Sequence, residues 1–101
     1  MNELNILKEL KKGDEKAFEI LFRKYVIILE NYAFFYTASR HVAEDIVQDV
    51  FFCVWRRKDS LKITTSLKAY LFRAVHNSCI QYLRHLKVTE KYNSVEKNKL
   101  E

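Results

Sequence analysis

The sequence predicts a compact, all-helical bundle of about four helices, the fold of a small binding module. The chain of 101 residues has one glycine and no proline, although strand-rich folds use both residues at their turns. Hydrophobic residues make up 49% and charged residues 31%, a mixture that supports a packed core rather than a disordered chain. Apolar side chains also recur every three or four residues, which is the spacing of a buried helix face.

Two helices are expected before residue 38. The first spans residues 3–12 and ends at Gly13, because glycine readily adopts the left-handed conformation that follows many helices. The second begins after Asp14, whose carboxylate can accept hydrogen bonds from free first-turn N–H groups. The expected buried positions of these two helices are Leu4, Ile6, Leu7, Leu10, Phe18, Leu21, Phe22, Tyr25, Leu29, Tyr32 and Tyr36.

Two further helices follow, each beginning at a serine that can cap exposed N–H groups. Ser39 precedes the third helix, which ends at the basic run 56–58, because cations stabilise helix C-termini. Residues 59–65 lack a helical period and are expected to form a loop before Ser66 and a fourth helix that ends near Lys87. The expected buried stripes are Ala43, Ile46, Val47, Val50, Phe51 and Val54, then Leu71, Ala74, Val75, Ser78, Cys79, Tyr82 and Leu86.

One domain is expected, because a chain of this length has little room for a second core. We assign residues 1–88 to this domain and residues 89–101 to a polar linker or tail, where the apolar period stops. No signal-like leader or apolar stretch of about 20 residues occurs. Cys53 and Cys79 are isolated and are expected to be reduced core thiols. A cytoplasmic protein with no membrane insertion is therefore predicted.

The charge is divided unevenly between the two halves of the chain. Residues 1–50 carry 7 basic and 9 acidic side chains, whereas residues 51–101 carry 11 basic and 4 acidic side chains. The net charge of +5 therefore comes from the second half. A polyanion such as nucleic acid is expected to bind there, and the first half is expected to meet a different partner.

A polar face on the third helix is the first candidate interface. Asp45, Gln48, Asp49 and Phe52 lie at helical offsets on the side opposite the buried stripe. Two interpretations are open from spacing alone. The face could be solvated, with early acids favoured by the helix dipole. It could instead bind a protein, with Phe52 as the buried anchor and the acids as orienting charges.

A basic face on the fourth helix is the second candidate interface. Its residues lie at helical offsets away from the buried stripe, and they are Arg73, His76, Asn77, Arg84 and Lys87. Arginine and lysine neutralise phosphates, and an asparagine can donate to and accept from a base edge. Lys62 in the preceding loop adds charge, and Tyr70 adds a ring for stacking, whereas Phe72 is expected in the core. An ordinary solvated helix face is the alternative.

No catalytic set is evident, so the chain is not expected to be an enzyme. A single glycine excludes a glycine-rich phosphate loop, and no serine has a histidine and a carboxylate in a recognisable setting. His76 and Cys79 could share a metal ion, but two ligands do not make a site. We therefore expect no metal and no cofactor.

Three runs in this order resemble the bacterial extracytoplasmic-function sigma factors. The first is residues 13–25, Gly-Asp-Glu-Lys-Ala-Phe-Glu-Ile-Leu-Phe-Arg-Lys-Tyr. The second is residues 43–51, Ala-Glu-Asp-Ile-Val-Gln-Asp-Val-Phe, closing on Trp55. The third is residues 66–77, Ser-Leu-Lys-Ala-Tyr-Leu-Phe-Arg-Ala-Val-His-Asn, continuing to Tyr-Leu-Arg at 82–84. Together they cover residues 3–87, so the resemblance is more specific than any one motif.

The resemblance implies the second conserved region of the family, an all-helical domain with two binding surfaces. One surface contacts the clamp helices of the RNA polymerase β′ subunit, and Asp45, Gln48, Asp49 and Phe52 fall at that position. The other recognises the minus-ten promoter element on the non-template strand. By position, Arg73, Asn77, Arg84 and the loop 61–65 fall there, and the loop is where the family takes up an extruded base. The candidates for that base pocket are Lys62, Ile63, Thr64 and Thr65.

Some features depart from the family pattern. Family members often carry arginine where His76 stands and an acid where Gln81 stands, so the charge of the DNA-facing helix is altered. The family also has a C-terminal helix-turn-helix domain, and this chain ends before one could begin, so we expect a longer sigma factor. The resemblance also implies an anti-sigma partner. The competing hypothesis is a helical protein-interaction module with a basic face and no DNA specificity.

Overall fold

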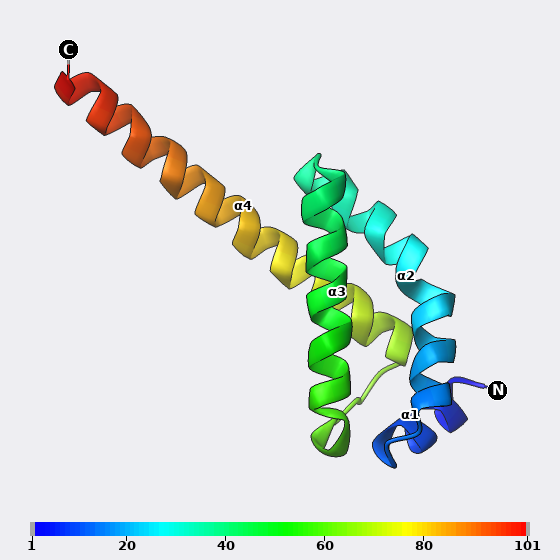
Figure 1. The fold of residues 1–101 in the computed structure, drawn as a ribbon. Helices are drawn as coiled ribbons and strands as arrows, with labels where there is room; N and C mark the ends of the chain where they lie inside the picture. The colour runs from blue at the N-terminus through cyan, green and yellow to red at the C-terminus, as the bar shows by residue number, and fades with distance from the viewer. Residues whose placement is uncertain (1, 101) are drawn as a thin grey trace.

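Four α-helices and one short 3₁₀ turn form the part of the chain that the structure describes. The computed structural model describes residues 2–100, with side chains described for residues 2–90. The elements are α1 (Glu3–Lys11), α2 (Glu15–Thr37), α3 (Arg40–Arg56), η1 (Lys58–Ser60) and α4 (Leu67–Leu100). Figure 1 shows α2, α3 and the first part of α4 together, α1 at one end, and the rest of α4 projecting from the bundle. The predicted all-helical fold class is confirmed, and the described residues contain no strand.

Side-chain caps start the helices where the sequence predicts them. Asp14 Oδ1 accepts from the Lys16 backbone N–H at 2.9 Å at the start of α2. Ser39 Oγ accepts from the Val42 N–H at 3.3 Å at the start of α3. Ser66 Oγ accepts from the Ala69 N–H at 3.0 Å at the start of α4. Each bond satisfies one of the N–H groups that a first helical turn leaves without a partner.

The helix ends follow two different rules. Gly13 follows α1 with a φ of +85°, the left-handed conformation that glycine adopts without a Cβ clash. Ala38 follows α2 with a φ of 54°, although it carries a Cβ, and its N–H donates to the Phe34 carbonyl at 2.8 Å. The first end was predicted from the glycine, whereas the second occurs at a residue that disfavours it.

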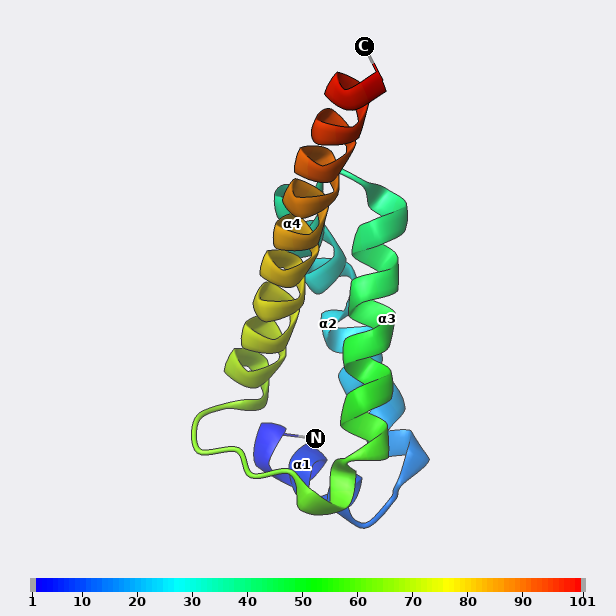
Figure 2. The same cartoon turned by 90° about the vertical axis from the view of Figure 1, so that its left-hand side faces the viewer.

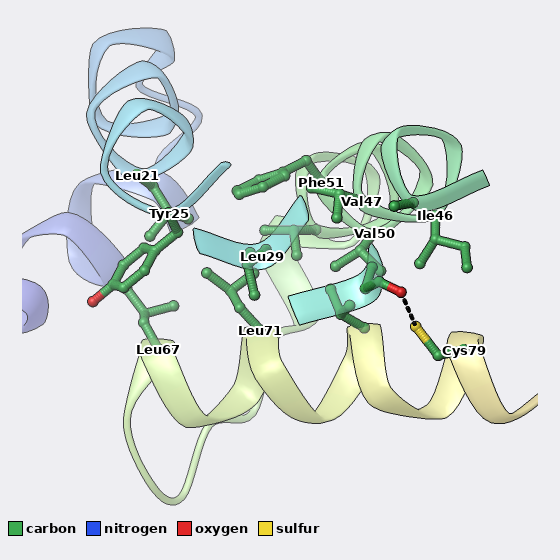
Figure 3. Close-up of a cluster of buried hydrophobic side chains, with 14 of the residues drawn as sticks. Leu21, Tyr25, Leu29, Ile46, Val47, Val50, Phe51, Leu67, Leu71 and Cys79 are labelled. Atoms are coloured by element: carbon green, nitrogen blue, oxygen red, sulfur yellow. Dashed lines mark hydrogen bonds between the residues drawn. The ribbon is translucent and has the colours of Figure 1, made fainter. Parts of the chain in front are cut away.

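The core lies where α2, α3 and α4 face one another. Figure 3 shows α2, α3 and α4 directing apolar side chains into one cluster, with the Cys79 thiol donating to the Ala33 carbonyl at 4.0 Å. The whole predicted stripe of α3 is buried. The fully buried side chains with the largest volumes are Phe51, Ile6, Leu10, Leu21, Leu29, Leu67, Leu71, Val47, Val75 and Cys79.

The prediction of core burial is wrong for three residues. Leu4 is 73% exposed, because α1 lies at one end of the bundle and buries Ile6 and Leu10 instead. Phe22 is 37% exposed and touches the core through one contact with the Phe51 ring, at a centroid distance of 5.0 Å. Leu86 is 40% exposed, because α4 has left the bundle by this point. Periodicity marks the buried side of a helix but not the length over which a neighbour covers it.

The fourth helix is longer than the sequence predicts. It was expected to end near Lys87, but α4 continues to Leu100. Figure 2 shows this part rising beyond the other helices. Residues 84–90 are all exposed, so this part of α4 is not held by core packing. The stretch has no glycine or proline to stop a helix, and helix propensity alone allows it to continue. None of the described helices is long and apolar enough to cross a membrane.

Candidate functional site

The polar face of α3 forms an exposed ridge, defined by Asp45, Gln48, Asp49 and Phe52 and called here the α3 ridge. All four side chains are exposed, and Phe52 is 60% exposed. The Arg56 guanidinium lies 5.4 Å from the Phe52 ring centroid. His41 Nε2 lies 3.4 Å from an Asp45 carboxylate oxygen. The structure therefore brings the four predicted residues together, around an aromatic ring that is open to solvent.

Two hollows flank the α3 ridge. On the α2 side, a hollow of about 340 Å³ is lined by Phe22, Val26, Glu30, His41, Glu44, Asp45 and Gln48. On the α4 side, a hollow of about 210 Å³ is lined by Asp49, Val50, Cys53, Val54, Arg57, Tyr70, Ala74 and Ser78. The first hollow combines an apolar floor with three carboxylates. A ridge between two hollows can pack into the groove between two helices of a partner.

The basic residues of α4 are exposed on the side away from the core. Arg73, Asn77, Arg84 and Lys87 all lie at the surface. A hollow of about 430 Å³, called here the α4 hollow, is lined by His76, Asn77, Ile80, Gln81 and Arg84. Lys87 lies one turn further along α4. The predicted face is therefore a continuous surface in which Asn77 lies next to cations.

The loop before α4 forms a separate hollow with the start of that helix. Lys62, Thr64 and Thr65 are exposed, Ile63 is half-buried, and Leu61 is buried in the core. The hollow has a volume of about 420 Å³ and is called here the loop hollow. Its lining residues are Lys62, Ile63, Thr64, Thr65, Ala69, Tyr70 and Arg73. All four loop residues singled out in the sequence thus meet Tyr70 and Arg73 in one place.

His76 is placed differently from the other residues of its face. Its side chain is half-buried, and its Nδ1 lies 3.1 Å from the hydroxyl oxygen of Tyr32 on α2. The Tyr36 ring packs edge-on against the imidazole at a centroid distance of 5.2 Å. The neighbouring Tyr36 hydroxyl and burial raise the pKa of Tyr32 to about 12. One edge of the basic face is therefore built by tyrosines from α2.

The described residues hold no cluster of three or more metal-ligating side chains. His76 contacts tyrosines from α2, and Cys79 is fully buried. Both cysteines are free thiols. Burial raises the pKa of the Cys79 thiol, which keeps it protonated. Cys53 is only half-buried, so the expectation of a core thiol is correct for Cys79 alone.

Sequence reasoning missed several residues that line these hollows. Phe22 and Glu44 join the α2 side of the α3 ridge, and Ile80 and Gln81 join the α4 hollow. Tyr32 was assigned to the core although it also reaches His76. A helical wheel could have placed Gln81 near Asn77, but contacts between α2 and α4 require the three-dimensional packing.

A known protein family matches the part of the chain that carries these surfaces. Residues 21–89 match the family described as sigma-70 region 2. The chain belongs to the sigma-70 region 2 family. The match begins within α2 and covers α3, the loop and the basic part of α4, so the resemblance drawn from the three sequence runs is confirmed.

Relatives of this sigma-70 region 2 chain are longer proteins. The chain is 30% identical over 81 residues to the ECF RNA polymerase sigma factor SigW of Bacillus subtilis (strain 168), covering 80% of this chain and 43% of SigW. It is 30% identical over 78 residues to the ECF RNA polymerase sigma-E factor of Escherichia coli (strain K12), covering 77% of this chain and 40% of that protein. The chain thus spans less than half the length of both relatives.

A solved structure shares both the fold and the extent of this region 2 chain. It is an NMR structure of an engineered region 2 of sigmaE in complex with GTAAAA. The TM-score is 0.73 at 27% sequence identity, and the likeness covers 84% of this chain and 88% of that chain. The region 2 fold of this chain is therefore the fold of a domain that has been solved with a short oligonucleotide.

Proposed function

We propose that this chain is the domain of a bacterial sigma factor that binds core RNA polymerase and reads the minus-ten promoter element. It is a binding module, and the chemistry of transcription is left to the polymerase. The α3 ridge binds the clamp helices of the β′ subunit, and the face of α4 with its preceding loop binds the non-template strand. The protein acts in the cytoplasm, and an anti-sigma factor regulates it by covering these surfaces.

The likeness to the region 2 of sigmaE solved with GTAAAA carries this proposal. That likeness covers 84% of the chain, and residues 21–89, which include the loop and the basic part of α4, match the sigma-70 region 2 family. The charge distribution supports the same assignment, because the second half of the chain holds 11 of the 18 basic residues. Exposed cations next to an amide suit a strand that is anchored through its phosphates and read through its bases.

The two hollows near α4 suit different parts of a single strand. The loop hollow combines the Tyr70 ring with hydroxyls from Thr64 and Thr65, which suits a base turned out of its stack. Taking up a base costs a few kcal/mol of unstacking, which these contacts offset. The α4 hollow places Arg84 beside Asn77, so a phosphate can be neutralised where a base edge is contacted.

The α3 ridge suits a helical partner with basic side chains. Phe52 supplies an exposed ring for burial, and Asp45 and Asp49 supply charge on the helical turns that precede it. The clamp helices of β′ are the proposed partner, and the two flanking hollows give them room. Because this ridge and the α4 face lie on different helices, one domain can hold both partners at once.

Fluorescence anisotropy with labelled GTAAAA and a scrambled strand tests the proposal. The wild-type chain should prefer GTAAAA, and Asn77→Ala should reduce that preference by about tenfold, since one bidentate base contact contributes about 1–3 kcal/mol. Asn31→Ala is the matched control, because it removes an exposed amide from α2. Equal binding of both strands would favour the competing interpretation, a protein-interaction module with a basic face.

A further inference from the structure

Tyr32 on α2 meets the imidazole of His76 on α4 at the edge of the α4 hollow. The Tyr32 hydroxyl oxygen lies 3.1 Å from His76 Nδ1, within hydrogen-bond distance. The Tyr36 ring stands at 84° to the imidazole, with the two centroids 5.2 Å apart. Two side chains of α2 therefore hold a ring that is carried by α4.

His76 reaches both α2 and the candidate nucleic-acid surface of α4. Nδ1 and Nε2 point in diverging directions from an imidazole, so a ring that turns Nδ1 to α2 turns Nε2 away from it. His76 also lines the α4 hollow together with Asn77 and Arg84. Nε2 is therefore the ring nitrogen that the contact with Tyr32 does not engage.

The hydrogen bond determines which nitrogen carries the proton. A phenol is a good donor and an unprotonated imidazole nitrogen is a good acceptor, so the arrangement that favours the bond has Tyr32 O–H donating to Nδ1. In a neutral imidazole with Nδ1 as acceptor, the proton lies on Nε2.

We propose that Tyr32 is a positioning residue for nucleic-acid binding, which holds His76 in the tautomer that presents Nε2–H to an acceptor oxygen of a strand in the α4 hollow. The nucleic-acid part of this inference rests on the proposed function. Arg73 and Arg84 supply fixed positive charge on the same face of α4, while His76 supplies an N–H donor of defined direction. A donor that is already oriented loses less side-chain entropy when the strand binds.

Nitrogen-15 NMR of labelled histidines tests the tautomer directly. The spectra are recorded at mildly alkaline pH, where imidazoles are neutral, and His76→Ala identifies the His76 signals. The wild type should show His76 with its proton on Nε2. Tyr32→Phe should give the mixture of tautomers that an exposed imidazole such as His85 shows. Tyr25→Phe is the matched control, because it removes the hydroxyl of another α2 tyrosine and leaves Tyr32, Tyr36 and His76 unchanged.

Binding to GTAAAA by the same variants tests the link to nucleic acid. Tyr32→Phe should weaken binding by about three- to tenfold, the size expected for one hydrogen bond. The double variant Tyr32→Phe, His76→Ala should bind no more weakly than His76→Ala alone, because Tyr32 acts through His76. Tyr25→Phe should bind like the wild type.

The possible outcomes separate the two proposals. Unchanged His76 signals in Tyr32→Phe overturn the role of Tyr32, whatever the binding result. A changed tautomer with unchanged affinity overturns the contact with the strand. If the wild type does not bind GTAAAA, the proposed function fails with the nucleic-acid part of this inference, and the NMR comparison still decides whether Tyr32 sets the tautomer.

Discussion

Glu3 Oε1 accepts a hydrogen bond from the Lys68 backbone N–H at 2.9 Å, across 65 positions of sequence. The bond joins the first residue of α1 to the first turn of α4. A carboxylate at this position satisfies a free N–H and also interacts favourably with the positive end of the helix dipole. Because Leu4, Leu7, Ile63 and Thr65 line one hollow beside it, α1 supports the loop as well as α4.

Replacing Glu3 with alanine should loosen the start of α4. Loss of this cap should lower the free energy of unfolding by about 0.5–1 kcal/mol. Chemical denaturation measures the change. Glu19→Ala is a matched control, because its exposed ion pair with Arg23, at 2.8 Å, is of a kind that contributes little. Equal stability losses in the two variants would contradict a specific role for Glu3.

Replacing Ala38 with glycine should stabilise the protein. Ala38 holds a left-handed φ of 54°, which costs a residue with a Cβ about 1–2 kcal/mol. Glycine removes that cost but loses more conformational entropy on folding, so the expected net gain is about 0.5–1 kcal/mol. Thermal unfolding should show a higher Tm. Ala69→Gly, within regular helix at the surface, should lower it, and a lower Tm for Ala38→Gly as well would refute the strain at this helix end.

Local signals made most of the fold predictable. Asp14, Ser39 and Ser66 act as caps because a single side chain bonds to its own helix, and the α3 stripe is buried because neighbours cover that helix along its length. The errors concern relations between helices. Leu86 lies in the correct stripe but beyond the reach of α2 and α3, and α4 continues past the point where packing stops.

Arg84→Ala should weaken binding to GTAAAA and also reduce its salt dependence. Each phosphate that a cation neutralises on a single strand contributes about 0.7 to the slope of log K against log salt concentration. The slope of the variant should therefore be shallower by about this amount. Arg23→Ala removes an exposed arginine of α2 and should leave the slope unchanged. A wild-type affinity that does not vary with salt would exclude phosphate contacts on this face.

Phe52→Ala should weaken binding to core RNA polymerase by tenfold or more, about the loss expected for a buried aromatic anchor. Asp49→Ala should weaken it as well, by removing an orienting charge. A titrated pull-down with core polymerase measures both. Phe35→Ala is the control, because Phe35 on α2 is 83% exposed and therefore more accessible than Phe52. Equal effects at both phenylalanines would assign the binding to general hydrophobicity instead of the α3 ridge.

The site could be predicted in part for the same physical reason as the fold. Residues that share one helix face, such as Asp45 and Asp49 or Arg73 and Asn77, follow from helical spacing. The hollow that joins Lys62 to Arg73 requires the path of the loop, and the pairing of His76 with Tyr32 requires the packing of α4 on α2. No spacing within one element contains that information.

The hydroxyl of Tyr32 should ionise at a higher pH than that of an ordinary tyrosine. Its pKa is raised from 10.0 to about 12, so the folded protein retains this proton over a pH range in which the unfolded chain loses it. The resulting contribution to stability is complete below pH 10 and is lost as pH rises toward 12. Ultraviolet titration of the tyrosinate band should therefore show a late step for Tyr32, at a pH above the ordinary tyrosine pKa.

Tyr32→Phe should remove this late step, while Tyr36→Phe should move it toward the ordinary pKa, because the Tyr36 hydroxyl is the main cause of the shift. The stability difference between the wild type and Tyr32→Phe should also shrink above pH 10, since the raised pKa no longer favours the folded state once both states are deprotonated. Titration of all tyrosines in a single step near the ordinary pKa would show that the hydroxyl is free of these contacts.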